Sequence, residues 1–147
     1  MSPRPLVGLG VAAVLAALAA LHAYWAVRGD PAGRAPGSPV VPTRPDGRPL
    51  FRPGGAATLA VAIALTSAAV IVLGCSGVLA PGGLTAWYRI GAWGVGAVLL
   101  LRAVGDFRYV GLFKRERRTP FARLDTRVYS PLCAALAAGV LYLAASP

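Results

Sequence analysis

The chain has 147 residues, a length that suits a single domain, and 56% of them are apolar while only 14% are charged. In ordinary soluble domains about a quarter of all residues are charged, so this composition excludes a typical soluble domain and indicates a membrane protein. A formal net charge of +10 is also typical of nucleic-acid binding. Because basic loops beside apolar helices follow the positive-inside rule, we favour membrane topology and expect no nucleic-acid partner.

The first apolar run, residues 5–27, is long enough for a transmembrane helix, which needs about 20 apolar residues. It closes with Tyr24 and Trp25, side chains typical of the membrane–water interface. The alternative is a cleaved signal peptide with Arg4 as its charged flank. Residues 28–55 follow no helical or alternating period and are rich in Pro, Gly and Arg, which predicts a loop with a turn at Pro45-Asp46-Gly47.

Three further apolar runs predict the other spans, at residues 56–79, 84–104 and 128–145. Ser130-Pro131 fits the first turn of the last helix, where a missing N–H is tolerated. The predicted fold is therefore all-α. It is a single domain, residues 1–147, that forms an integral membrane four-helix antiparallel bundle packed through Gly, Ala and Ser.

Lys and Arg counts predict the orientation of this bundle. The loops at residues 28–55 and 105–127 hold twelve basic residues, Arg34 among them, against two at Arg4 and Arg89. The positive-inside rule then places both loops in the cytoplasm and both termini outside. A cleaved signal peptide would leave the first Arg-rich loop outside, so we keep residues 5–27 as a span.

No common catalytic or cofactor motif occurs. The sequence lacks a P-loop, GxSxG and HExxH, and the single His and two Cys have no metal-ligand spacing. We expect no metal site and no cofactor. Cys75 and Cys133 lie at different depths of the predicted bundle, so we expect no disulfide between them.

The candidate ligand-binding residues come from three predicted spans and converge at the cytoplasmic interface. They are His22, Trp25, Arg102, Asp106, Arg108, Asp125 and Tyr129. Arg102 and Asp106 are four apart, which predicts an ion pair on one helix face. The alternative is a structural network that fixes the helix ends. Further along the loop, a run of basic residues is expected to face anionic lipid headgroups: Lys114, Arg115, Arg117 and Arg118.

Four function classes compete on these residues. The first is a protein that binds a lipid headgroup or a small anionic ligand in the polar layer. The second is a membrane enzyme with His22 and Asp106 or Asp125 as acid-base groups, and the sequence does not decide whether the protein is an enzyme. A small transporter and a structural or assembly subunit are the others. The expected partners are anionic membrane lipids, with a homo-oligomer or a membrane-protein partner left open.

Several sequence blocks resemble a known family. They are HAYW at residues 22–25, RPLFRP at 48–53, LRAVGDFRYVG at 101–111, FARLDT at 121–126 and YSPLC at 129–133. Together they are similar to a bacterial family of small four-helix membrane proteins classed only as a domain of unknown function. The resemblance implies a multi-pass protein of the bacterial cytoplasmic (inner) membrane, and it implies no activity.

Overall fold

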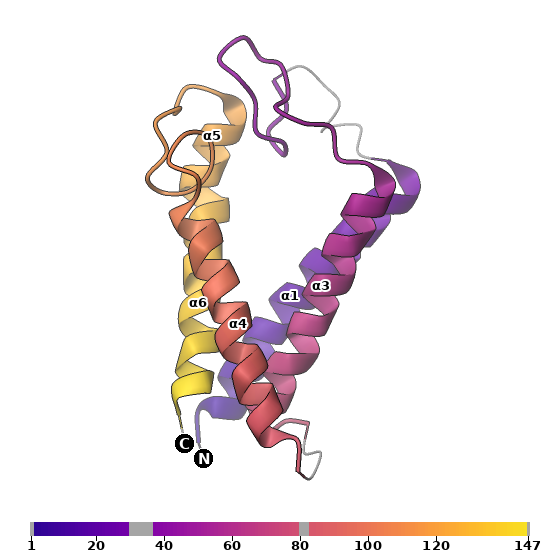
Figure 1. The fold of residues 1–147 in the computed structure, drawn as a ribbon, viewed down its shortest axis with the longest axis vertical. Coiled ribbons are helices and arrows are strands. Elements are labelled where there is room, and N and C mark those ends of the chain that lie inside the picture. The colour runs from indigo at the N-terminus through magenta and orange to yellow at the C-terminus, as the bar shows by residue number, and fades with distance from the viewer. Residues whose placement is uncertain (1, 30–36, 80–82, 147) are drawn as a thin grey trace.

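The computed structural model describes residues 2–29, 37–79 and 83–146 of the chain. Its long helices are α1 (Arg4–Arg28), α3 (Gly55–Cys75), α4 (Thr85–Val104) and α6 (Ser130–Ala145). Both chain ends lie at one end of the molecule, and the two long loops lie at the other, which we call the loop end (Figure 1). The predicted all-α fold of four packed helices is confirmed.

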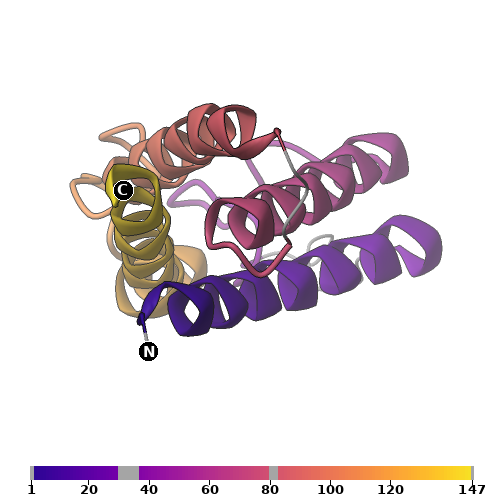
Figure 2. The same cartoon turned by 90° about the horizontal axis from the view of Figure 1, so that it is seen from below.

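The four helices form two closely packed pairs, α1 with α3 and α4 with α6 (Figure 2). The pairs meet near the chain ends and diverge toward the loop end (Figure 1). The buried apolar core lies where they meet, and it includes Leu15, Val72, Val140 and Leu143. Tight apolar packing is therefore concentrated in the half of the bundle near the chain ends.

Small residues let the helices approach closely, as the composition predicted. A Cβ on Gly74 would overlap the ring of Tyr88, and one on Gly96 would overlap Leu141. Gly94, by contrast, has nothing within 4 Å of such a Cβ. Gly74 and Gly96 thus set the contacts that α4 makes with α3 and α6.

Within the described parts of the chain, three helices are long and apolar enough to cross a membrane: α1, α3 and the continuous helix Pro120–Ala145. The third predicted span forms a helix too, because α4 covers Thr85–Val104, but α4 is not among these three. It carries Arg89 and Arg102 and is less apolar than the others. Helix α3 ends at Cys75, four residues before the predicted limit, and Gly77 follows with a φ of 82°.

The last helix starts earlier than the sequence predicted. The predicted limits, a loop at residues 105–127 and a helix from residue 128 with Ser130-Pro131 in its first turn, are wrong at this point, because α5 (Pro120–Leu124) already continues into the helix. Thr119 caps α5 by accepting a hydrogen bond of 3.1 Å from the Ala122 N–H, and Pro120 takes the first position.

A π-helical turn, η1 (Asp125–Tyr129), joins α5 to α6. Pro131 lacks an N–H, and its ring would crowd a carbonyl four residues earlier in a regular α-helix. The wider turn accommodates Pro131, and the Ser130 N–H donates to the Asp125 carbonyl. Asp125 therefore lies inside a continuous helix and not in a loop before it.

Residues 30–36 of the first loop, Arg34 among them, lie outside the described residues. The predicted turn at Pro45-Asp46-Gly47 is confirmed. Gly47 has a φ of 81°, and its N–H donates to the Arg44 carbonyl at 2.9 Å. Cys75 and Cys133 are both free thiols.

Candidate functional site: a buried charge cluster beside a cavity

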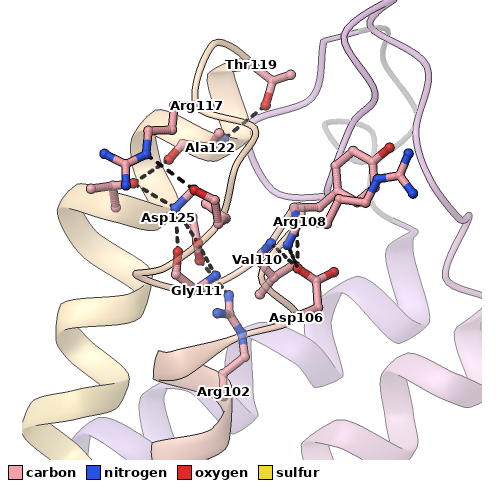
Figure 3. Close-up of polar contacts among 12 residues, drawn as sticks. Arg102, Asp106, Arg108, Val110, Gly111, Arg117, Thr119, Ala122 and Asp125 are labelled. Atoms are coloured by element: carbon pink, nitrogen blue, oxygen red, sulfur yellow. Dashed lines mark hydrogen bonds and ion pairs between the residues drawn. The ribbon is translucent and has the colours of Figure 1, made fainter.

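A fully buried carboxylate, Asp125, anchors the loop end of the α4–α6 pair. The Arg102 Nη2 donates to Asp125 Oδ1 at 2.8 Å, and the Lys114 Nζ donates to Oδ2 at 2.9 Å (Figure 3). The Gly111 N–H also donates to Oδ2 at 2.8 Å. We call Asp125, Arg102 and Lys114 the Asp125 cluster. It ties α4, the second loop and the last helix together.

Lys114 is 1% exposed, so the prediction that it faces lipid headgroups is wrong. Its ammonium donates to Asp125, to the Thr126 hydroxyl at 2.7 Å and to the Gly111 carbonyl at 2.9 Å. These three acceptors match the three donors of an ammonium group. Arg115, Arg117 and Arg118 are exposed and stay candidates for lipid headgroups.

Gly105 and Gly111 close the loop that places the Gly111 N–H beside Asp125. Gly105 and Gly111 have φ angles of 86° and 95°, and their backbones lie in contact. A Cβ on either would overlap the other segment's backbone. Both the left-handed conformation and the close approach require glycine here.

The predicted ion pair between Arg102 and Asp106 is wrong. Helix α4 ends at Val104 and Gly105 turns the chain, so Asp106 no longer shares a helix face with Arg102. Asp106 Oδ1 instead accepts the backbone N–H groups of Arg108, Tyr109 and Val110 at 2.9, 2.7 and 2.9 Å (Figure 3). Arg102 pairs with Asp125 in its place.

Asp106 gives a pH prediction for the loop. Burial alone would raise its pKa, but the N–H donors of Val110, Tyr109 and Arg108 lower the pKa below its ordinary value of 3.8. This contribution to stability is therefore present above pH 3.8 and is lost as pH falls through the lower folded pKa.

We expect Asp106→Asn to speed amide hydrogen exchange in the loop at neutral pH, with the difference from wild type vanishing in strong acid. Hydrogen exchange measured by mass spectrometry on the peptide covering residues 106–111 checks this. Asp46→Asn, in the other loop, is the control. Equal exchange of that peptide in wild type and Asp106→Asn at neutral pH would show that the carboxylate does not hold the turn.

A cavity of about 720 Å³ lies between the two helix pairs at the loop end. Its lining residues include His22, Trp25, Arg52, Val61, Arg102 and Phe121. The volume falls within the roughly 300–1,000 Å³ typical of small-molecule sites. Three sequence-predicted candidates, His22, Trp25 and Arg102, thus come together here from α1 and α4.

His22 has a defined hydrogen-bonding role in this wall. Its Nδ1 lies 2.8 Å from the Leu18 carbonyl, which only accepts, so Nδ1 carries a proton. The ring packs edge-on against Trp25, with centroids 5.4 Å apart. In the neutral imidazole, this arrangement leaves Nε2 as an acceptor.

Arg102 connects the cavity to the Asp125 cluster. The cluster holds two cations and one anion, so one positive charge is left over. Among the described residues, the Arg102 Nη1 is buried without a hydrogen-bond partner, while its side chain as a whole is 35% exposed. The surplus positive charge therefore belongs to a cluster whose Arg102 lines the cavity, as Arg52 also does.

The other candidates lie elsewhere. The Tyr129 hydroxyl donates to the Pro39 carbonyl at 3.3 Å and so holds the first loop. Arg108 lies 5.1 Å from the Tyr109 ring centroid, and with Asp106 it lines a separate hollow of about 520 Å³. The predicted single polar layer is therefore divided among the cluster, the cavity and this hollow.

The geometry gives the acid-base alternative no support. Neither Asp106 nor Asp125 lines the cavity that contains His22, and Asp125 is engaged by Arg102, Lys114 and Gly111. Among the described residues, no three His, Cys, Asp or Glu side chains gather as metal ligands would.

Comparison with known proteins places this architecture in a family. No curated protein and no solved structure matches the chain. A family model described as "Protein of unknown function (DUF3995)" matches residues 8–140, which include most of α1, all of α3 and α4, the Asp125 cluster and most of α6. The chain therefore belongs to the DUF3995 family of proteins of unknown function.

Proposed function

We propose that this protein binds an anionic ligand, either a lipid headgroup or a small anion, in the cavity between its helix pairs. The observation that carries the proposal is the surplus positive charge of the Asp125 cluster at the cavity wall. A ligand phosphate or carboxylate would supply the second negative charge.

Arginine suits this role better than lysine. Its planar guanidinium presents several N–H donors and holds carboxylate or phosphate groups in a fixed geometry. Asp125 already engages Nη2, which orients the guanidinium before a ligand arrives. Arg52 also lines the cavity, and His22 stands in the opposite helix pair. Arg102, on α4, and Arg52, in the loop before α3, would thus bring two cationic side chains to the anion.

The proposal includes a membrane setting. We place the protein in the bacterial inner membrane as a multi-pass protein with the loop end toward the cytoplasm, because the Lys- and Arg-rich loops lie there. The cavity would then lie at the level of the cytoplasmic leaflet. Exposed Arg115, Arg117 and Arg118 would contact anionic headgroups around it, each contributing about 1 kcal/mol near the surface.

Thermal unfolding in neutral detergent tests the proposal. A ligand that binds only the folded state stabilises it, by about 2.7 kcal/mol at a hundred times its dissociation constant. We expect phosphatidylglycerol or inorganic phosphate to raise the Tm of wild type. The rise should be retained in Arg89→Gln, which removes a charge from the opposite end of α4, and should be absent in Arg102→Gln. No rise in wild type, or equal rises in both variants, would refute the proposal.

A further inference from the structure

We infer that the ligand of this cavity is a membrane amphiphile, with its anionic head at Arg102 and its hydrocarbon chain along the cavity face of α3. The inference rests on the proposed function and narrows it from any anion to a lipid. Three observations support it: the chemistry of the lining, its position along α3 and the divergence of the helix pairs.

The lining is mostly apolar away from the basic side chains. Val40, Val41, Val61, Val110 and Phe121 all contribute to it. A phosphate or other small anion would fill little of a cavity of about 720 Å³ and would leave these side chains without contacts. A hydrocarbon chain would pack against these apolar side chains, while an anionic head would pair with the Arg102 charge.

The apolar wall extends into the depth of the span. Val61 follows the first residue of α3, Gly55, by six positions, or about 9 Å along the helix axis. Val61 lines the cavity and is 44% exposed, so much of its side chain is left uncovered by the protein. Ala57, one turn earlier, is also exposed and also lines the cavity.

The third observation is the divergence of the helix pairs. Helices α3 and α4 are close near the chain ends and separate toward the loop end (Figure 1). Val61 lies in the half of α3 that is nearer to the loop end. The cavity lies where the two helices have separated, because Ala57 and Val61 line it from α3 and Arg102 lines it from α4. In the inferred arrangement the lipid head would lie at the level of the loops and the chain between the pairs. The anionic head would then pair with the surplus charge of Arg102.

Fluorescence quenching of Trp25 by brominated lipid tests this arrangement. Trp87 and Trp93 are 71% and 49% exposed, so Trp87→Phe with Trp93→Phe leaves Trp25 in the cavity wall as the one tryptophan. The protein is placed in phosphatidylcholine nanodiscs that contain a small fraction of either brominated phosphatidylglycerol or brominated phosphatidylcholine. Bromine on the chain quenches Trp25 only on close approach.

We expect an apparent preference of about tenfold for the brominated anionic lipid, the size expected for one charge-assisted hydrogen bond. Arg102→Gln should abolish the preference, and Arg89→Gln should keep it. A second pair of variants tests the position of the hydrocarbon chain. Ala57→Phe places a ring in the cavity and should reduce the quenching of Trp25. Ala56→Phe, at an exposed neighbour outside the lining, should leave the quenching unchanged. Neither Phe variant changes a residue of the Asp125 cluster, so the comparison of these two variants remains informative even if Arg102→Gln unfolds.

The same fluorescence measurement with inorganic phosphate in place of lipid distinguishes a failure of this inference from a failure of the proposed function. If phosphate changes Trp25 fluorescence through Arg102 and the brominated anionic lipid shows no preference, the anion site stands and the lipid inference is overturned. Equal quenching in Ala57→Phe and Ala56→Phe would also overturn it, because the chain would then lie outside the cavity. If neither phosphate nor lipid has an Arg102-dependent effect, both proposals fail.

Discussion

Asp125→Asn should destabilise the protein by about 3–5 kcal/mol, the size expected when one partner of a buried ion pair is removed. The substitution keeps the shape of the side chain but leaves Arg102 and Lys114 without their shared anion. Lys114 is fully buried and has no route to solvent without opening the loop. Thermal or denaturant unfolding in neutral detergent measures the loss.

The matched control for this prediction is Asp46→Asn. Asp46 lies in the first loop with 53% of its side chain exposed, and its contact with Arg48 is a long one of 3.9 Å. Exposed pairs contribute about 0–1 kcal/mol, so the control should stay close to wild type. The double variant Asp125→Leu with Lys114→Met should lose less stability than the two single variants combined, because it removes both buried charges. Equal stability of Asp125→Asn and Asp46→Asn would contradict the role given to the cluster.

Gly111→Ala should have the second large effect, a loss of at least about 3 kcal/mol of folding free energy. Its φ of 95° disfavours any side chain, and a Cβ there would overlap the Val104 carbonyl. The loop would have to open, which would withdraw the Gly111 N–H from Asp125. Gly105→Ala should behave alike, because its Cβ would meet the Val110 carbonyl.

Gly10→Ala is the control for the glycine prediction. Gly10 lies inside α1, and nothing lies within 4 Å of a Cβ built on it. Alanine there should stabilise the helix, by up to about 1 kcal/mol. Unfolding measured on both variants should therefore give shifts of opposite sign. A Gly111→Ala protein as stable as Gly10→Ala would mean that the loop does not need its glycine contact.

Hydropathy alone located the long helices well, because span length and apolar composition are local properties of the chain. The predicted runs at residues 5–27 and 84–104 lie within one residue of the observed α1 and α4 limits. The start of the last helix was missed because Ser130-Pro131 looked like an N-terminus. The true start signal, Thr119-Pro120, was present and had the same chemistry, an N-cap followed by Pro.

The candidate site was predicted less completely, because its contacts are long-range. Arg102 and Asp125 were both named, but the pairing between them depends on a loop closed by Gly105 and Gly111. Lys114 lies in a basic run that looks like an exposed surface. Nothing in its local sequence distinguishes it from exposed Arg115, and only the fold shows that it is buried beside Asp125.

Arg102 bears on both interpretations of the polar residues, as a structural network that fixes the helix ends and as a ligand site. Its Nη2 belongs to the network, since it holds Asp125 in the last helix. The same side chain also lines the cavity to which His22 and Trp25 contribute. Under the proposed function one side chain would serve both roles, and a variant that removes it would affect stability and binding together. The conservative variant Arg102→Lys keeps the charge and helps to separate the two.

The most direct test of the anion site is native mass spectrometry of the protein released from neutral detergent with added phosphatidylglycerol. The measured quantity is the fraction of protein that retains one lipid, compared among wild type, Arg102→Gln, Arg102→Lys and Arg89→Gln. We predict retention in wild type and Arg89→Gln, partial retention in Arg102→Lys and about a tenfold weaker association in Arg102→Gln. Equal retention in Arg102→Gln and Arg89→Gln, with both variants folded, would contradict the assignment of an anion site to this cavity.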